Sequence, residues 1–148
     1  ARIMAARGIH LVPTLKALAG IATPPGPGIP EDIIAKARGR RDDRDTTFRL
    51  ALAEGVPIAM GTDAATPFNV HGRNAEELTI MVELGMTALA AIAAATSVAA
   101  RATGRDDVGV IAAGRLADLV VWQGDPGRDV GLLQRPPLAV FFGGARVA

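Results

Sequence analysis

Cysteine is absent from this chain of 148 residues, and aromatic residues make up only 3% of it. Without cysteine the chain can form no disulfide, no zinc-thiolate site and no catalytic thiol. The chain also lacks an excess of either charge, because 16 basic residues against 15 acidic ones leave a formal net charge of +1. The sequence therefore offers neither a basic surface nor stacking rings, and nucleic acid is not an expected partner.

Long apolar runs are also missing, since no segment reaches the roughly 18 consecutive apolar residues of a membrane-spanning helix. The nearest candidate, ALAAIAAATSVAA at residues 88–100, contains Thr96 and Ser97 and is predicted to be a packed helix. The chain is nevertheless 49% hydrophobic, with a mean hydropathy of +0.27, which excludes a disordered chain. We expect a globular protein without a membrane partner.

The chain opens with the end of a predicted helix and a short strand. Residues 1–8, ARIMAARG, resemble the final turns of a helix that stops at Gly8. The apolar residues that follow, at 9–12, predict a short buried strand, which Pro13 limits because proline cannot donate to a sheet. The absence of a methionine or a signal-like segment at the start suggests that N-terminal sequence is missing.

A long loop and a charged helix are predicted next. The segment at 19–32, AGIATPPGPGIPED, is dense in glycine and proline and predicts a loop without regular structure. A helix is expected from Pro30 to Gly55, with acidic residues in its first turn. Its central segment at 38–45, RGRRDDRD, is interpreted as a solvated face with pairs of mixed sign.

A second apolar strand is predicted at residues 56–60, VPIAM, followed by a loop at 61–73. Asn74 is a predicted N-cap, and Glu77 three residues later would complete a capping box. The helix that they begin is expected to end at Gly85.

The next predicted helix is capped by Thr87 and closed by Gly104. Its expected apolar stripe consists of Leu89, Ile92, Ala93 and Val98. After Gly104, β-branched and aromatic runs alternate with turns, which predicts several strands without helices between them. The order favours a parallel α/β layer followed by part of an antiparallel sheet.

Asp63 directly follows the second apolar strand, in GVPIAMGTDA at 55–64. In parallel α/β folds, functional groups gather at the carboxyl ends of strands. An ionised carboxylate beside a buried strand needs a partner such as a metal ion, a histidine or an arginine. Position alone leaves two interpretations open: a functional carboxylate, or a structural one that accepts loop amides or caps a turn.

His71 and His10 are the chain's two histidines. His71 lies in the loop after Asp63, where a lone histidine more often makes a surface or hydrogen-bonding contact than binds a metal. His10 falls inside the first predicted strand and is interpreted as a packed side chain. Because a closed zinc site takes four protein ligands and an open one about three, any metal site must be completed by residues that this chain lacks.

Three segments together resemble the C-terminal portion of the metal-dependent amidohydrolase superfamily, with prolidase-like and imidazolonepropionase-like members the nearest. They are GVPIAMGTDA at 55–64, the stretch HGRNAEELTIMVELGMTALAAIAAATSVAARATG at 71–104, and VGVIAAGRLADLVVWQGDP at 108–126. RGIHLVPTL near the start resembles the seventh barrel strand of the same group. The order and spacing of these motifs cover nearly the whole chain.

The resemblance implies an α/β fold: the C-terminal part of a distorted (β/α)8 barrel, with strands 7 and 8 at residues 1–104, and the C-terminal strands of a small β-sandwich at 105–148. It implies that Asp63 binds a divalent metal, most simply zinc as one or two ions, and takes a proton from the metal-activated water during attack on an amide carbonyl. It suggests His71 as a substrate contact. The implied substrate is a small amide, dipeptide or cyclic amide.

The remaining metal ligands of this family, including its strand-one HxH pair, have no counterpart in these 148 residues and are expected upstream of Ala1. We therefore expect this chain to be the last part of a longer protein and to be inactive alone. The sequence is compatible with a homo-oligomer of the full-length form. The cytoplasm is the favoured compartment. The alternative is a non-catalytic α/β module or partner-binding subunit with Asp63 as a structural turn residue. A nucleotide-binding domain is disfavoured because no glycine-rich phosphate motif follows either strand.

Overall fold

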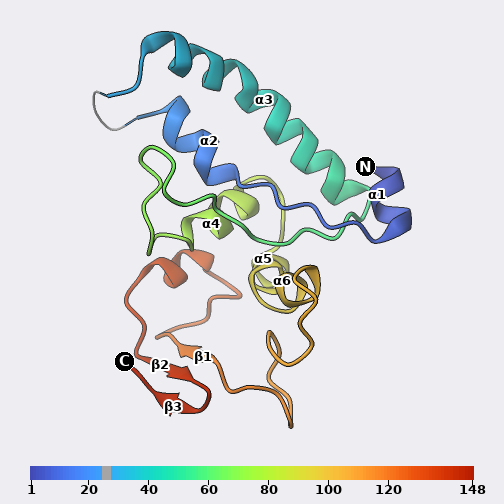
Figure 1. Cartoon of the computed structure of the whole chain (residues 1–148), viewed down its shortest axis with the longest axis vertical. Helices are drawn as coiled ribbons and strands as arrows, with labels where there is room; N and C mark the ends of the chain where they lie inside the picture. The colour runs from blue at the N-terminus through green and yellow to red at the C-terminus, as the bar shows by residue number, and fades with distance from the viewer. Residues whose placement is uncertain (25–27) are drawn as a thin grey trace.

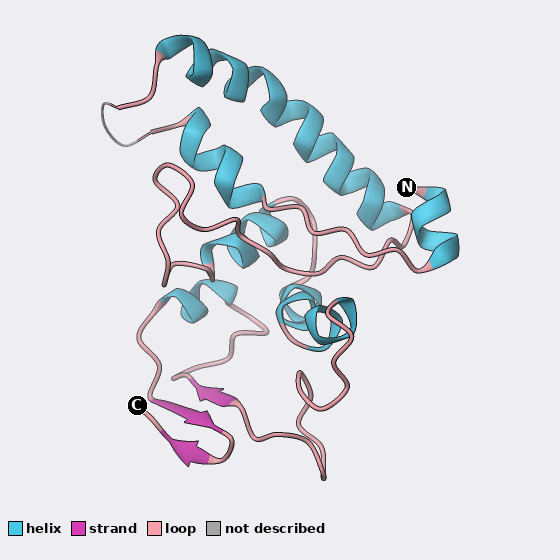
Figure 2. Cartoon of the chain, in the orientation of Figure 1, coloured by secondary structure: helices cyan, strands magenta, loops and turns pink. Residues whose placement is uncertain are grey.

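The computed structural model describes residues 1–24 and 28–148, as a layer of helices beside a small sheet (Figures 1 and 2). Part of the predicted loop at 19–32, residues 25–27, lies outside the described residues. Helices and strands confirm a mixed architecture. In chain order the elements are α1 (Arg2–Arg7), α2 (Leu15–Ala22), α3 (Glu31–Ala53), α4 (Glu76–Glu83), α5 (Ala88–Ala95), α6 (Ser97–Ala102), β1 (Leu119–Val121), η1 (Val130–Gln134), β2 (Ala139–Phe142) and β3 (Ala145–Arg146).

The two predicted apolar strands run parallel and meet at a single bridge between Leu11 and Ile58. The Leu11 amide donates to the Pro57 carbonyl, and the Ala59 amide donates to the Leu11 carbonyl, both at 2.9 Å. These segments extend side by side across the middle of Figure 1. Their parallel direction brings their carboxyl ends, and the loops that follow, to one edge of the molecule.

The first of these segments is not the buried strand that the sequence predicts. Ile9 and Val12 are about half exposed, whereas Ile58 and Ala59 in the second segment are buried. The described residues pair the first segment with one neighbour only, so its other side has no strand to cover it.

Gly61 marks the closest approach of the two segments. A Cβ at this position would overlap the Cγ1 atom of Val12 and would lie 3.7 Å from Cγ2 of Thr14. Only glycine lets the two chain ends pack together at this point. The loop carrying Asp63 therefore starts directly beside the start of α2.

The hydrophobic core lies between the helices and the second strand segment. Phe48 of α3, Leu15 of α2 and Met81 of α4 are its largest fully buried apolar side chains. The other buried members are Ala51, Val56, Ile58, Leu78, Leu84, Met86, Ala91, Ala94 and Val130. Truncating one of the large members to alanine typically removes about 2 to 5 kcal/mol of stability.

Helix α2 occupies part of the segment predicted to be a loop. Gly20 lies inside this helix, and a Cβ there would sit 3.0 Å from the Pro67 carbonyl oxygen and 3.7 Å from Cβ of Phe68. The glycine is thus present for close contact with the 61–73 loop, although it suggested a helix breaker. The predicted helix from Pro30 to Gly55 is confirmed as α3, which the acidic residues Glu31 and Asp32 begin. None of the described helices has both the length and the apolar composition to cross a membrane.

The capping box predicted before α4 is wrong. The helix is N-capped by Ala75 without any side-chain hydrogen bond, and Glu77 is fully buried instead of turning back to Asn74. The cap at the next helix is confirmed, since Thr87 Oγ1 accepts the Ala90 amide at 3.2 Å.

The helix predicted up to Gly104 divides at Thr96 into α5 and α6. The Ala94 carbonyl accepts the Met60 amide at 2.9 Å, whereas in an unbroken helix it would accept from Val98. The predicted apolar stripe is also wrong. Leu89 is largely exposed, and the buried positions are Ala91, Ala94 and Ala100.

The tail forms the predicted antiparallel strands, in the order β1, β2, β3. Val120 pairs with Val140, and Phe141 pairs with Arg146. The β2–β3 connection is Gly143–Gly144, both at positive φ, the conformation of a two-residue hairpin turn. The sheet is smaller than the sequence suggests, because the described residues 108–118 contain no strand.

Candidate functional site

Asp63 lies at the carboxyl end of the second strand segment, at the start of the 61–73 loop. Its side chain is exposed, and its φ of 53° places the residue in the left-handed region. Among the described residues, the carboxylate has no hydrogen bond or ion pair. Asparagine and aspartate tolerate this conformation better than other non-glycine residues.

Asn69 holds the backbone on which Asp63 is carried. Its side-chain amide nitrogen donates to the carbonyl oxygens of Thr62 at 2.6 Å and Asp63 at 3.0 Å, and lies 3.2 Å from Thr66 Oγ1. Its main chain closes the loop, because Ala65 donates to the Asn69 carbonyl at 2.8 Å and Asn69 donates to the Thr66 carbonyl at 2.9 Å. The side chain of Asn69 is 2% exposed, so these bonds form away from competing water.

The same loop contains two further non-glycine residues at positive φ, Ala65 at 79° and Phe68 at 60°. Such conformations cost energy and persist only when the surroundings determine them, and they concentrate at functional sites. The backbone conformation of this loop is therefore held by the hydrogen bonds of Asn69 and by packing against α2.

The structure does not join His71 to Asp63. His71 is exposed near the far end of the loop, before Gly72 at a φ of 89°. Within the described part of the chain no hydrogen bond or ion pair links the two residues. His10 is partly buried in the first strand segment, in keeping with a packed side chain.

Glu77 is a buried carboxylate that sequence reasoning missed. It accepts the backbone amides of Leu15 at 2.8 Å and Lys16 at 2.7 Å, which are the first two residues of α2. The carboxylate thus caps a helix that lies more than sixty residues away in sequence. Burial raises the pKa of Glu77, while the two amides and the nearby Arg44 and Lys16 oppose that rise.

Arg44 completes this network from α3. Its guanidinium donates to the Leu15 carbonyl at 2.7 Å and pairs with Asp45. The side chains of Arg44 and Asp45 are only 13% and 17% exposed. The interpretation of the whole 38–45 segment as a solvated face is therefore wrong at these two positions. Arg38 of the same segment donates to the Ala22 carbonyl at 3.0 Å, at the opposite end of α2.

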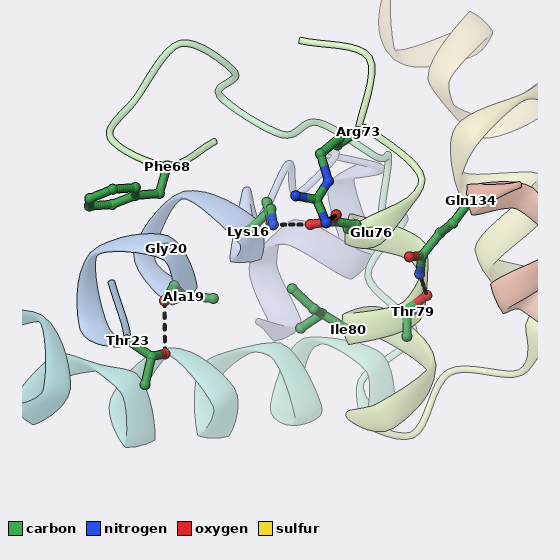
Figure 3. A pocket seen from close by; sticks show the side chains of 10 residues that line it. All are labelled: Lys16, Ala19, Gly20, Thr23, Phe68, Arg73, Glu76, Thr79, Ile80 and Gln134. Carbon is green, nitrogen blue, oxygen red and sulfur yellow. Dashed lines mark hydrogen bonds and ion pairs between the residues drawn. The ribbon is translucent and has the colours of Figure 1, made fainter. Parts of the chain in front are cut away.

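A cavity of about 370 Å³ lies between α2, the end of the 61–73 loop, α4 and η1 (Figure 3). Lys16 and Arg73 both form ion pairs with Glu76 on its wall. The remaining lining residues are Ala19, Gly20, Thr23, Phe68, Thr79, Ile80 and Gln134. Neither Asp63 nor His71 lines this cavity.

The described residues do not form a complete metal site. No group of three histidine or acidic side chains in residues 1–24 and 28–148 is arranged to hold a metal ion. Asp63 by itself fits the role of one ligand, because its carboxylate is free and its oxygens suit divalent cations.

Known proteins match nearly the whole chain. The profile of the Amidohydrolase family matches residues 1–147. An uncharacterized protein of Mycobacterium tuberculosis is 35% identical over 149 residues, which cover 95% of this chain and 37% of that protein. Ochratoxinase of Aspergillus niger is 32% identical over 137 residues, 90% of this chain and 28% of that enzyme.

Two further matches correspond to the resemblance seen in the sequence. Imidazolonepropionase of Pyrobaculum arsenaticum is 36% identical over 95 residues, 64% of this chain and 23% of that enzyme. A crystal structure of a Xaa-Pro dipeptidase with bound methionine superposes with a TM-score of 0.86 at 34% identity, over 98% of this chain and 36% of that structure. The chain spans less than two fifths of the length of each of these proteins. It belongs to the Amidohydrolase family.

Proposed function

We propose that this chain is part of a metal-dependent hydrolase that cleaves carbon-nitrogen bonds in small amides, dipeptides or cyclic amides. Membership of the Amidohydrolase family supports the reaction class. The similarity to a Xaa-Pro dipeptidase and to an imidazolonepropionase supports the substrate class. In this proposal, residues 1–104 belong to a (β/α)8 barrel and residues 105–148 to a small β-sandwich.

The observation that carries the proposal is the free carboxylate of Asp63 on a backbone fixed by Asn69. The carboxylate is exposed at the carboxyl end of a parallel strand pair, where functional groups collect in such folds. A positioned carboxylate can accept a proton from an attacking water and pass it to the leaving nitrogen. Asp63 is assigned both roles, metal ligand and proton acceptor.

Asp63 would hold the metal, most simply zinc, together with ligands that these 148 residues do not supply. When bound, the metal supplies the Lewis acidity that lowers the pKa of water and polarises the substrate carbonyl. His71, exposed on the same loop, is assigned a contact to substrate. Because no three histidine or acidic side chains of the described residues are grouped to hold a metal ion, the chain on its own is proposed to be inactive.

The geometry of the loop disfavours the alternative of a purely structural Asp63. A structural aspartate would accept loop amides through its side chain, as Asp129 does from the Gly131 amide at 2.9 Å. In the 61–73 loop the Asn69 side chain holds the main chain instead, by donating to the carbonyl oxygens of Thr62 and Asp63. The carboxylate of Asp63 makes no hydrogen bond or ion pair with the described residues, which favours a functional role.

The test is the Asp63→Asn substitution in the complete gene product that contains these 148 residues. Asparagine tolerates the left-handed backbone, so the loop is expected to keep its shape. With zinc and a panel of Xaa-Pro dipeptides and cyclic amides, kcat/KM should fall by about 10² to 10⁴-fold, together with the bound zinc. The control is Asp42→Asn, an exposed aspartate of α3 whose side chain has no hydrogen bond or ion pair to described residues. Equal activity of the two variants would contradict the proposal.

A further inference from the structure

We propose that Glu77 is a positioning residue for Asp63 and acts on it through helix α2. The inference rests on the proposed function, in which the carboxylate of Asp63 receives the proton. Within the described part of the chain, no hydrogen bond or ion pair joins Glu77 to Asp63. An effect of one residue on the other therefore has to pass through the elements between them.

Glu77 fixes the start of α2. The first amides of a helix have no partner within it, and in α2 the two carboxylate oxygens of Glu77 accept those of Leu15 at 2.8 Å and Lys16 at 2.7 Å. Glu77 is 0% exposed, so water does not compete for these bonds. Arg44 of α3 donates to the Leu15 carbonyl at 2.7 Å. The first turn of α2 is thus held from α4 and from α3.

Thr14 is the N-cap residue of α2 but does not cap it. Its φ of 45° and ψ of 49° are left-handed, and its side chain makes no capping hydrogen bond. A β-branched residue in this conformation is strained, whereas a threonine in the extended conformation of an ordinary N-cap would supply the acceptor itself. The position of the first turn therefore depends on Glu77 and not on the local cap residue.

The chain around α2 contacts the Asp63 loop on both sides of Asp63. Before it, a Cβ at Gly61 would lie 3.7 Å from Cγ2 of Thr14. After it, a Cβ at Gly20 would lie 3.0 Å from the Pro67 carbonyl oxygen. A shift of α2 would therefore be felt at both ends of the segment that carries the carboxylate.

The second of these contacts leads directly to Asp63. Phe68 packs on α2 at Gly20 (Figure 3), and the next residue, Asn69, donates to the Asp63 carbonyl at 3.0 Å. A shift of α2 would thus move Asn69 and with it Asp63. Displacing a reacting group by about 1 Å can lower a rate about 10²-fold.

The first test needs neither metal nor substrate. It measures hydrogen exchange of the Ala65 amide, which donates to the Asn69 carbonyl at 2.8 Å, in the complete gene product without metal. Glu77→Gln replaces one of the two acceptor oxygens with an NH₂ group and should speed this exchange at least about fivefold. Glu83→Gln, at an exposed position of the same helix, should leave it unchanged. Equal exchange in the two variants would overturn the proposal.

Kinetics of the zinc-loaded protein separate positioning from a general loss of stability. Glu77→Gln should lower kcat about 10- to 100-fold and change KM less than about twofold, because the displaced group acts in the transition state. Phe141→Ala truncates a side chain of β2, at the opposite end of the molecule from α2 (Figure 1), and should change neither constant. A comparable fall in kcat in both variants, or no fall in Glu77→Gln, would refute the positioning role.

Gly20→Ala tests the route through α2 while Glu77 stays in place. The added Cβ pushes α2 away from Pro67 and should lower kcat about tenfold, whereas Gly39→Ala, with nothing within 4 Å of the added Cβ, should not. Because both changes act through α2, the double variant Glu77→Gln, Gly20→Ala should lose less than the product of the single losses. Losses that multiply would overturn the route.

Asp63→Asn separates this inference from the proposed function. Loss of activity in Asp63→Asn, with unmodified kcat in Glu77→Gln, would overturn the positioning role alone. Full activity in Asp63→Asn would overturn the proposed function and the positioning role with it. If both hold, Glu77→Gln should cause no further loss when Asp63 is already asparagine.

Discussion

Asn69 fixes the main chain of Asp63, because its side-chain amide nitrogen lies 3.0 Å from the Asp63 carbonyl oxygen. The same nitrogen lies 2.6 Å from the carbonyl oxygen of Thr62, so the two consecutive peptide groups are held by one buried side chain. The left-handed conformation of Asp63 is thereby stabilised without using its carboxylate. The functional group and the group that positions it are separate residues of one loop.

Replacing Asn69 with alanine should therefore release this loop. Loss of the buried donor leaves carbonyl oxygens unsatisfied, and we expect a loss of about 1 to 3 kcal/mol in the free energy of unfolding. Urea denaturation measures this change, and hydrogen exchange should show faster exchange of the Ala65 amide. The control is Asn74→Ala, at an exposed position outside the helix cap. Equal stability of the two variants would contradict the assigned role of Asn69.

Glu77→Ala should be strongly destabilising although glutamate is usually a surface residue. The substitution removes the acceptor for the first two amides of α2, and the loss should reach at least about 2 kcal/mol. Glu83 lies on the same helix but is exposed, so Glu83→Ala should change the free energy of unfolding by less than about 0.5 kcal/mol. A small effect at both positions would show that the α2 cap contributes little.

The pH dependence of stability should carry a signature of Glu77. Burial raises its pKa in the folded protein above the ordinary value of 4.5, so the folded state keeps a proton that the unfolded state has lost. The contribution of this group is therefore fully present below pH 4.5 and is lost as pH rises through the folded pKa.

Urea denaturation at a series of pH values, for the unmodified protein and for Glu77→Gln, isolates this contribution. The difference in free energy of unfolding between them should fall as pH rises from 4.5. A difference that stays constant, or that grows with pH, would mean that the folded protein does not raise the pKa of Glu77.

Replacing glycine with alanine should have opposite effects on stability at Gly61 and at Gly39. Gly61→Ala introduces a Cβ that overlaps Val12, and should destabilise by about 1 to 3 kcal/mol. Gly39 lies within α3 with nothing near its missing Cβ, so Gly39→Ala should stabilise by about 0.5 to 1 kcal/mol. The double variant Val12→Ala, Gly61→Ala should recover part of the loss. Thermal unfolding distinguishes these outcomes, and a neutral Gly61→Ala would refute the close approach.

Local sequence signals predicted those features that depend on neighbouring residues. Gly8 ends α1 with a φ of 63° and Thr87 caps α5, each as its residue type predicts. The position of Asp63 after an apolar strand was recognisable for the same reason. In these cases the residues adjacent in sequence determine the local backbone conformation.

Features that depend on distant contacts were not recognisable. Asn74 and Glu77 have the spacing of a capping box, yet Glu77 binds amides of α2, which local spacing cannot reveal. Gly20 resembled a loop residue, because its reason for being glycine is the Pro67 carbonyl across the fold. Likewise Arg44 looked solvated within a charged run, and only the packing of α3 on α2 brings it to the Leu15 carbonyl.

The central claim is that Asp63 acts as one ligand of a site completed outside these 148 residues. The most direct measurement is amide hydrolysis by the isolated 148-residue chain in the presence of zinc, with Xaa-Pro dipeptides as substrates and Asp63→Asn as the comparison. The account predicts no hydrolysis above that of zinc alone for either protein. Hydrolysis by the isolated chain that disappears in Asp63→Asn would contradict it.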